Sequence, residues 1–407
     1  MKEIANELGE VVVRGKRPTI RQEAGKMIVG ISGSSLSEAG NLMDVFKRTP
    51  GLQVKDGALS VFGRGKPIVF INGREVRNAE EYESLQSDDI ATIEIDRNPS
   101  AKYSASGNSV VRITTKKITK DRLNLQVFNH SYFARKFTNL SGVKLNSKWK
   151  KTLISLNYSY SENKSKKYED AYEINTQPNY VLKNESNSES VYADQRHSLF
   201  ASISQQLGKK HTLGGQFSYF DMDRNATNLG MQKISKTNQP LTKREVLNNE
   251  DYVYNLATYN VNYRFEIDSV TKLNVLGDYT HSTSDNESNI SEKNLTANSL
   301  QKSTIFNQND YDVYSARADF ETALSKKLPL QMGVKFSQVE NDGATVATDM
   351  LQQIQKYTTS NSTTDRIGAA YLMISPTLGK WNLEAGLRYE HTDRNVVATG
   401  ATVLDTT

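Results

Sequence analysis

The sequence predicts a mainly β protein in two parts, a small α+β domain followed by antiparallel strands that cross a membrane as part of a β-barrel. Three observations lead to this fold class. After residue 117, apolar and polar residues alternate with period two. Short lysine-bearing turns alternate there with long polar loops. Before residue 117, a helical segment is mixed with short strands, and a mean hydropathy of −0.61 over 407 residues is too polar for an ordinary globule of this length.

One short helix is expected near the start of the first part. The stretch NLMDVFKRTPG places Leu42, Val45 and Phe46 on one helical face. Pro50 and Gly51 follow directly, and neither continues a helix. The helix therefore ends before Pro50.

Short strands are expected in the rest of this part. Leu59 and Val61 share one side of a strand, and the apolar run 68–71 leads into Asn72-Gly73, a dipeptide that tolerates the left-handed turn of a tight hairpin. Residues 78–85 open with a capping-box pattern and predict a second helix. The stretch 90–95, IATIEI, predicts another strand.

The second part shows alternation in several clear stretches, among them ISLNYSY at 154–160, YNVNYRFEI at 259–267 and WNLEAGLRY at 381–389. Each such strand has one apolar and one polar face. We expect about eleven strands, near 123–134, 138–148, 152–164, 193–205, 211–224, 250–266, 270–284, 308–324, 328–340, 364–377 and 381–393. Each of these eleven strands matches or exceeds the 9 to 11 residues that a tilted strand needs to cross hydrocarbon.

The connections between these strands favour a membrane barrel. Tight turns such as SKWKK and LGKKH alternate with loops rich in Asn, Ser, Thr and Asp at 165–192, 225–249, 285–307 and 341–363. Outer-membrane barrels have short periplasmic turns and long extracellular loops. A soluble all-β protein with aromatic residues in its core is the alternative, and it does not account for the asymmetry of the loops.

Several function classes find little support. No window approaches 18 apolar residues, and the first ten residues lack the apolar region of a signal peptide. Cysteine is absent, and the five histidines, at 130, 197, 211, 281 and 391, show no catalytic or metal-ligand spacing. The net charge of +5 is dispersed, which argues against nucleic-acid binding. We expect no enzyme activity, no metal site and no cofactor.

Three stretches carry a family resemblance: LGEVVVRGKRP at 8–18, VFKRTPGLQVKDGALSVFGRGKPIVFINGREV at 45–76, and IATIEIDRNPSAKYSASGNSVVRITTKK at 90–117. In this order they resemble the plug domain of TonB-dependent outer-membrane receptors. The residues after 117 resemble the start of the receptor barrel by pattern only.

The resemblance implies a 22-stranded barrel with the plug folded in its lumen, in the outer membrane of a Gram-negative bacterium and in contact with outer-membrane lipid. It implies import of an unidentified extracellular ligand, either a siderophore, cobalamin or a glycan. The expected domains are an extended segment (1–14), the plug (15–117) and the N-terminal half of the barrel (118–407). About eleven of 22 strands would leave two open edges in lipid, so we expect the chain to be a fragment cut at both ends.

The resemblance assigns a coupling role to Glu10, Val11, Val12 and Val13. They occupy the place of the TonB box, an extended segment that adds as a strand to TonB, the periplasmic energy-coupling protein. β-Branched residues suit strand addition, in which main-chain hydrogen bonds supply affinity. The alternative is that these valines form the first strand of the plug.

The resemblance also suggests a lock between plug and barrel. Arg97 is the candidate to pair with inward carboxylates of the barrel wall, Glu266, Glu321 and Glu384, because a guanidinium binds two carboxylate oxygens at once. Many relatives have glycine after this arginine, whereas this chain has Asn98. An exposed arginine at a turn is the alternative.

Ligand contacts are expected in the long loops, with Arg64 and Arg74 at the plug apices as further candidates. Three function classes compete. Energy-driven import is favoured by the plug and by the TonB-box-like segment. A receptor or adhesin that binds without transport is the alternative, and a barrel enzyme comes last.

Overall fold

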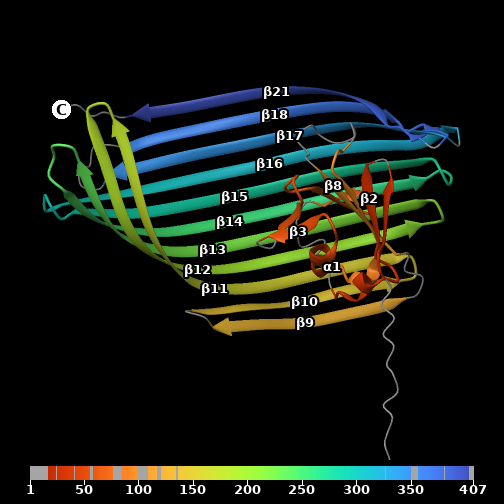
Figure 1. The fold of residues 1–407 in the computed structure, drawn as a ribbon, viewed down its shortest axis with the longest axis horizontal. Helices are drawn as coiled ribbons and strands as arrows, with labels where there is room; N and C mark the ends of the chain where they lie inside the picture. The colour runs from red at the N-terminus through yellow and green to blue at the C-terminus, as the bar shows by residue number, and fades with distance from the viewer. Residues whose placement is uncertain are drawn as a thin grey trace, which may run out of the picture. The chain divides into compact units, whose positions relative to one another are not determined.

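The computed structural model describes residues 17–23, 25–40, 42–55, 58–76, 85–99, 109–116, 121–133, 136–325, 327–349, 356–379 and 381–402. The chain divides into two compact units (Figure 1). The first unit contains the residues up to Thr119 together with Met373–Gly386, and the second contains Lys120–Leu372 and Leu387–Thr407. The domain ranges 1–14, 15–117 and 118–407 stay predictions.

The first unit is built on a six-stranded sheet in the order β1-β2-β7-β8-β5-β6. Its pairs are antiparallel except β5 with β8, which run parallel. The strands are β1 (Thr19–Glu23), β2 (Lys26–Gly30), β5 (Ile68–Ile71), β6 (Arg74–Glu75), β7 (Ile90–Asp96) and β8 (Val110–Thr115). Two small hairpins, β3 (Leu52–Lys55) with β4 (Ala58–Val61) and β19 (Thr377–Leu378) with β20 (Trp381–Asn382), complete the strands of this unit.

Helix α1 (Leu42–Arg48) forms as predicted, with Leu42, Val45 and Phe46 fully buried in the apolar core of this unit. The chain turns at Gly51, whose φ of 83° favours glycine. Two 3-10 helices, η1 (Ser35–Glu38) and η2 (Ser87–Asp89), lie at other turns.

The predicted hairpin at Asn72-Gly73 is confirmed. Both residues have positive φ, 52° and 87°, which is the backbone that a two-residue hairpin loop between β5 and β6 requires. The strand at 90–95 is confirmed as β7. The predicted helix over 78–85 falls mainly on residues 77–84, which lie outside the described residues.

The second unit contains one antiparallel sheet of eleven strands, which confirms the predicted number. The strands follow chain order across the sheet, with β9 and β21 at its edges (Figure 1). They are β9 (Arg122–Phe133), β10 (Phe137–Trp149), β11 (Thr152–Gln177), β12 (Tyr180–Leu207), β13 (His211–Lys236), β14 (Thr242–Glu266), β15 (Lys272–Asn294), β16 (Ser299–Ser325), β17 (Leu328–Asp349), β18 (Lys356–Ile374) and β21 (Ala385–Thr402).

The predicted long loops are wrong. The stretches 165–192, 225–249, 285–307 and most of 341–363 continue the strands, and the turn after β11 contains only residues 178–179. The stretches expected to be long loops are therefore mostly the polar ends of long hairpins, and their backbone is still strand. β12 has 28 residues, so it is about 90 Å long at about 3.3 Å per residue.

This length explains the error. About ten residues of a tilted strand cross the hydrocarbon, and the rest of each strand extends beyond it. In that extension both faces meet water, so side chains give no apolar alternation. Backbone pairing persists nonetheless, as the unbroken register between β11 and β12 shows.

Candidate functional site

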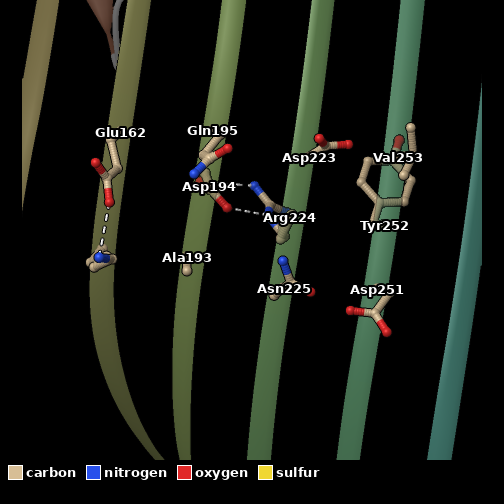
Figure 2. A pocket seen from close by; sticks show the side chains of 11 residues that line it. Glu162, Ala193, Asp194, Gln195, Asp223, Arg224, Asn225, Asp251, Tyr252 and Val253 are labelled. Atoms are coloured by element: carbon tan, nitrogen blue, oxygen red, sulfur yellow. Dashed lines mark hydrogen bonds and ion pairs between the residues drawn. The ribbon is translucent and has the colours of Figure 1, made fainter.

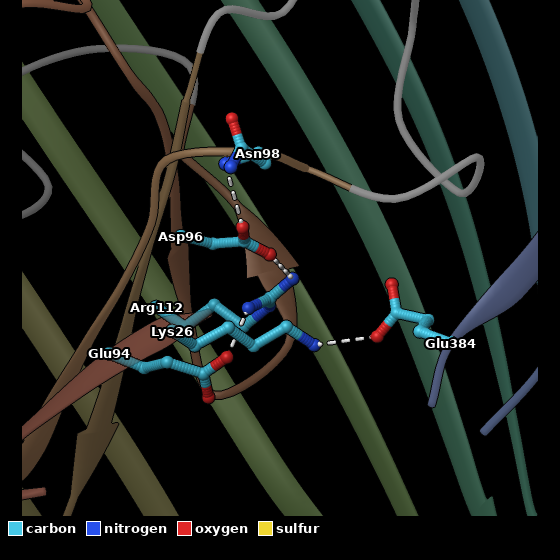
Figure 3. A network of polar contacts seen from close by, with 6 residues as sticks. All are labelled: Lys26, Glu94, Asp96, Asn98, Arg112 and Glu384. Carbon is cyan, nitrogen blue, oxygen red and sulfur yellow. Dashed lines mark hydrogen bonds and ion pairs between the residues drawn. The ribbon is translucent and has the colours of Figure 1, made fainter. Parts of the chain in front are cut away.

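A charged cluster lies on the sheet of the first unit, where β2, β7 and β8 are neighbours (Figure 3). Glu94 on β7 lies directly opposite Arg112 on β8 and forms an ion pair with it. Lys26 on β2 lies opposite Asp96 on β7. Strand pairing thus brings four charged side chains together, because residues opposite each other on neighbouring strands share one face.

Asp96 is the most deeply buried member of this cluster. Only 2% of its side chain is exposed, and its carboxylate accepts a hydrogen bond from the Asn98 backbone N–H at 3.1 Å and lies 3.5 Å from Arg112 Nη2. A buried carboxylate needs such partners, because removing one partner of a buried ion pair costs about 3–5 kcal/mol. Arg112 therefore fixes the end of β7, where the chain leaves the sheet.

The cluster extends to a distant part of the chain through Lys26. Its Nζ lies 3.2 Å from Glu384 Oε2, and the two side chains are 22% and 26% exposed. Glu384 follows the hairpin β19–β20, in the segment Met373–Gly386 that belongs to the first unit. One ion pair thus joins strand β2 to the connection between β18 and β21 (Figure 3).

The predicted lock residues have other neighbours. Glu384 pairs with Lys26, and Glu266 pairs with Arg264 at 2.9 Å. The guanidinium of Arg97 lies against Gly51, where an added Cβ would come within 2.9 Å of Arg97 Nη2. Glu321 lies opposite Lys272 in the register of β15 and β16. The pairing of Arg97 with barrel carboxylates stays a prediction.

The other predicted site residues are placed as follows. Glu10 to Val13 lie outside the described residues. Arg64 lies in the turn after β4, and its Nη2 donates to Asn98 Oδ1 at 2.7 Å. Arg74 lies opposite Ile71 in the hairpin β5–β6. A ligand-binding role for Arg64 and Arg74 stays a prediction.

The sheet of the second unit has two different faces. Ile154, Ile203 and Val261 share one face through the pairing of β11 to β14, and each is more than 40% exposed. The opposite face carries polar side chains such as Asn157 and Asn260, both buried. Apolar side chains that face outward and polar side chains that face the lumen are the pattern of a transmembrane barrel.

Aromatic rings line the edge of the apolar band. Tyr259, Tyr279 and Tyr314 lie opposite one another on β14, β15 and β16, with ring centroids 6.0 and 5.0 Å apart. The hydroxyl of Tyr279 donates to Asp312 Oδ1 at 2.8 Å. Tyrosine has an apolar ring and a polar hydroxyl group, so it favours the boundary between lipid and water. The boundary of the membrane therefore crosses β14 to β16 near this row.

A hollow of about 330 Å³ lies against β11 to β14 beyond the apolar band (Figure 2). Because side chains alternate along a strand, most of the lining residues share the outward face of Glu162. The lining residues are Glu162, Lys164, Ala193, Asp194, Gln195, Asp223, Arg224, Asn225, Asp251, Tyr252 and Val253. Four of the eleven lining residues are acidic and two are basic, and Lys164 is paired with Glu162 at 2.9 Å.

A second polar cross-link ties β16, β17 and β18 together on the polar face. Asp319 lies 2.8 Å from Arg317 Nε and accepts a hydrogen bond of 2.5 Å from the Tyr371 hydroxyl. Gly333 lies opposite Asp319, and a Cβ there would come within 2.7 Å of the Asp319 carboxylate and of a backbone oxygen. The missing side chain at Gly333 makes room for this cluster.

Within the described ranges, none of the helices combines the length and the hydrophobicity that a membrane-crossing helix needs. The same part of the chain contains no group of three or more His, Cys, Asp or Glu side chains arranged to hold a metal ion.

Comparison with known families identifies the sheet. Residues 263–403 match the model of the outer membrane protein β-barrel family. This part of the chain, about one third of its length, is similar to that family. The match covers the end of β14 and the strands that follow it. The match agrees with the predicted fold class of antiparallel barrel strands of the outer membrane. A search among curated proteins found no match.

Several solved structures are similar to this chain at low identity. They include the ferric citrate transporter FecA in its unliganded form (11% identity, 91% of this chain and 70% of that chain covered, TM-score 0.35). The ferric yersiniabactin uptake receptor FyuA from Yersinia pestis follows (10%, 90% and 72%, 0.36). The siderophore receptor PirA from Pseudomonas aeruginosa is a third (11%, 93% and 100%, 0.24).

The sequence did not indicate one of these features. Lys26 as the partner of Glu384 required the register of β2 with β7.

Proposed function

We propose that this protein is a plugged outer-membrane receptor of a Gram-negative bacterium that binds an extracellular ligand and imports it with energy delivered by TonB. The observation that carries the proposal is the ion pair between Lys26 and Glu384. Both residues belong to the first unit, which has its own apolar core, and the ion pair links strand β2 there to the segment of chain between β18 and β21.

A weak ion pair suits a plug domain that stays in place without applied force and moves when TonB pulls on it. Both side chains are about one quarter exposed, and ion pairs near a surface contribute at most about 1 kcal/mol. Leu42, Val45 and Phe46 in the core of the small domain are fully buried, and each contributes several times as much, about 2–5 kcal/mol. Breaking the ion pair therefore costs less free energy than removing one core side chain of the small domain.

The segment Glu10 to Val13 is the proposed contact with TonB. Its three consecutive valines suit an added edge strand. The alternative function, a receptor or adhesin that does not transport, needs no such contact. The two functions therefore differ in a measurable interaction that does not require knowledge of the ligand.

The test is disulfide cross-linking in whole cells. These 407 residues contain no cysteine, so Val12→Cys introduces a single thiol into this chain. We expect it to cross-link to TonB that carries single cysteines in its edge strand, with a yield that depends on which TonB position is used. Arg21→Cys in strand β1 is the control, and it should not cross-link. Equal yields for the two variants, or none for Val12→Cys, would contradict the proposal.

A deletion separates coupling from binding. Removing residues 10–13 should abolish uptake while extracellular ligand remains bound at the cell surface. A receptor or adhesin that does not transport would show the same surface binding before and after the deletion and no uptake in either case.

A further inference from the structure

A group of aromatic and charged side chains lies on the polar face of β12, β13 and β14. We call it the inner patch. In the register of these strands Asp194 lies opposite Arg224, and Arg224 lies opposite Tyr252. Figure 2 shows Arg224 reaching Asp194 from the neighbouring strand. The inner patch consists of Tyr192, Asp194, Arg196, Phe220, Arg224, Tyr252 and Tyr254.

Two of the rings of the inner patch are nearly parallel, and a third, Phe220, is tilted by 57° against Tyr254. Tyr252 and Tyr254 are two residues apart on one strand, and their rings lie within 7° of parallel with centroids 6.4 Å apart. Phe220 packs beside Tyr254 at 5.9 Å. On the other side of the patch, the Arg224 guanidinium lies 5.9 Å from the centre of the Tyr192 ring. All four aromatic side chains are half-buried, so their outer faces remain available to a ligand.

The charges of the inner patch are compensated within it and by one adjacent carboxylate. Asp194 is 4% exposed and lies 2.7 Å from both Arg196 Nη2 and Arg224 Nε. Glu250, opposite Ala226, lies one position beyond Tyr252 on the same face. The two guanidinium groups and the one carboxylate of the patch leave a single positive charge, which the adjacent carboxylate of Glu250 offsets. The guanidinium groups are one third exposed and keep N–H donors that point away from Asp194.

The neighbouring strands surround the inner patch with small uncharged polar groups. On the same face and at the same level, β11 presents Ser159, Ser161, Asn163 and Ser165, and β15 presents Ser282, Ser284, Asn286 and Ser288. These side chains offer hydroxyl and amide groups that both donate and accept hydrogen bonds. The patch is thus a neutral aromatic platform with a polar rim.

We infer that the inner patch binds an uncharged polyhydroxylated ligand, an oligosaccharide, which deepens the proposed function by naming the substrate class. The C–H faces of a sugar ring stack on flat aromatic surfaces. Its hydroxyl groups pair with planar polar groups such as guanidinium and carboxylate, and with serine and asparagine at the rim. A polyanionic ligand would need a positive surface, and the compensated charges of the patch do not supply one.

The experiment measures binding to the purified full chain in detergent by titration calorimetry. The probes are neutral oligosaccharides, namely maltoheptaose, xylohexaose, mannohexaose and chitohexaose, with citrate as the anionic comparison. Tyr252→Ala and Tyr254→Ala remove the stacking surface, whereas Tyr252→Phe keeps it. Val253→Ala is the matched control, because Val253 is next to both tyrosines on the same strand and faces the other way.

We expect at least one neutral oligosaccharide to bind, and each tyrosine-to-alanine variant to weaken binding about tenfold. Tyr252→Phe and Val253→Ala should change the affinity less than about twofold. Binding of citrate in place of the sugars, no binding of any sugar, or equal affinity in Tyr252→Ala and Val253→Ala would each overturn the inference.

The calorimetric result is independent of TonB. If sugars bind but Val12→Cys does not cross-link, the inner patch is supported as a ligand site and the proposed import is contradicted. A successful cross-link with no sugar binding would keep import and overturn the substrate class.

Discussion

The two units bury apolar side chains to very different extents. The first unit has a continuous buried core in a small fold: Val29, Ile31, Leu36, Leu42, Val45, Phe46, Leu52, Leu59, Val61, Val69, Ile71, Ile90, Ile93, Ile95, Val111 and Ile113. Within the described part of the second unit, the buried apolar side chains are Phe200, Ala226, Ala369 and Tyr371. A sheet of eleven strands is therefore held together in another way.

The difference shows which forces act in each unit. The first unit gains about 25 cal/mol for each Å² of apolar surface that it removes from water. The strands of the second unit keep their apolar side chains on the outside, where lipid replaces water, and are held by the backbone ladder and by cross-strand pairs. Substitutions should therefore have different effects in the two units, and labelling should reveal where lipid covers the sheet.

The largest expected contrast is in chemical labelling of the outward face of β14. Val261 and Val253 lie eight residues apart on this face, and Val253 has Asn255 and Asp251 as its neighbours there. In intact cells, Val253→Cys should react with a membrane-impermeant maleimide, whereas Val261→Cys should stay unlabelled because lipid covers it. The measurement is the labelled fraction of each variant. Equal labelling of both would show that the apolar band is not in lipid.

The next largest effect concerns one side chain from each unit. Phe46→Ala should destabilise the first unit by about 4 kcal/mol, because it leaves a cavity in a closed core. Leu156→Ala on the apolar face of β11 should cost less than about 1 kcal/mol in a lipid bilayer, because lipid fills the space. Hydrogen exchange of the amides of β7 and β12 in the full chain measures each effect. Similar costs at both sites would contradict the comparison.

A smaller effect is expected where the sheet itself is tightly packed. Gly333→Ala should destabilise the sheet by about 2 kcal/mol, since the added Cβ would meet Asp319, Tyr371 and a backbone oxygen at 2.6–2.7 Å. Gly277→Ala is the matched control in β15, where no atom lies within 4 Å of the added Cβ. The heat-induced shift of the barrel on electrophoresis reports both variants. The prediction fails if they unfold at the same temperature.

The smallest expected effect on stability is at the turn between β14 and β15, and it depends on pH. The backbone N–H groups of Val270 and Thr271 donate to Asp268 at 2.8 and 2.7 Å, and these bonds hold the pKa of the Asp268 carboxyl below its ordinary value. A lowered pKa stabilises the fold above the ordinary value, and this contribution is lost as the pH falls through the lowered pKa.

Asp268→Asn keeps an acceptor oxygen without the charge. The difference in thermal midpoint between the native chain and this variant should therefore be constant near neutral pH and shrink as the pH falls below about 4. A difference that stays constant down to pH 2 would show that the charge of Asp268 has no role in the turn.

Local patterns determined the small domain and the strand-forming part of the sheet. Leu42, Val45 and Phe46 predicted α1 because helical spacing places them on one face, and Asn72-Gly73 predicted the hairpin because few other dipeptides adopt two successive positive φ values. Alternation predicted eleven strands because one face meets lipid and the other the lumen.

Only the tertiary structure decided how far the strands extend and which charges meet. Beyond the membrane both faces of a hairpin are wet, so residues 165–192 show no apolar alternation although their backbone is fully paired. The partner of Glu384 is Lys26, 358 residues away, and neither residue carries a local signal for the other. Sequence patterns report the environment of each side chain, whereas backbone pairing and long-range ion pairs depend on register, which arises only when the strands assemble.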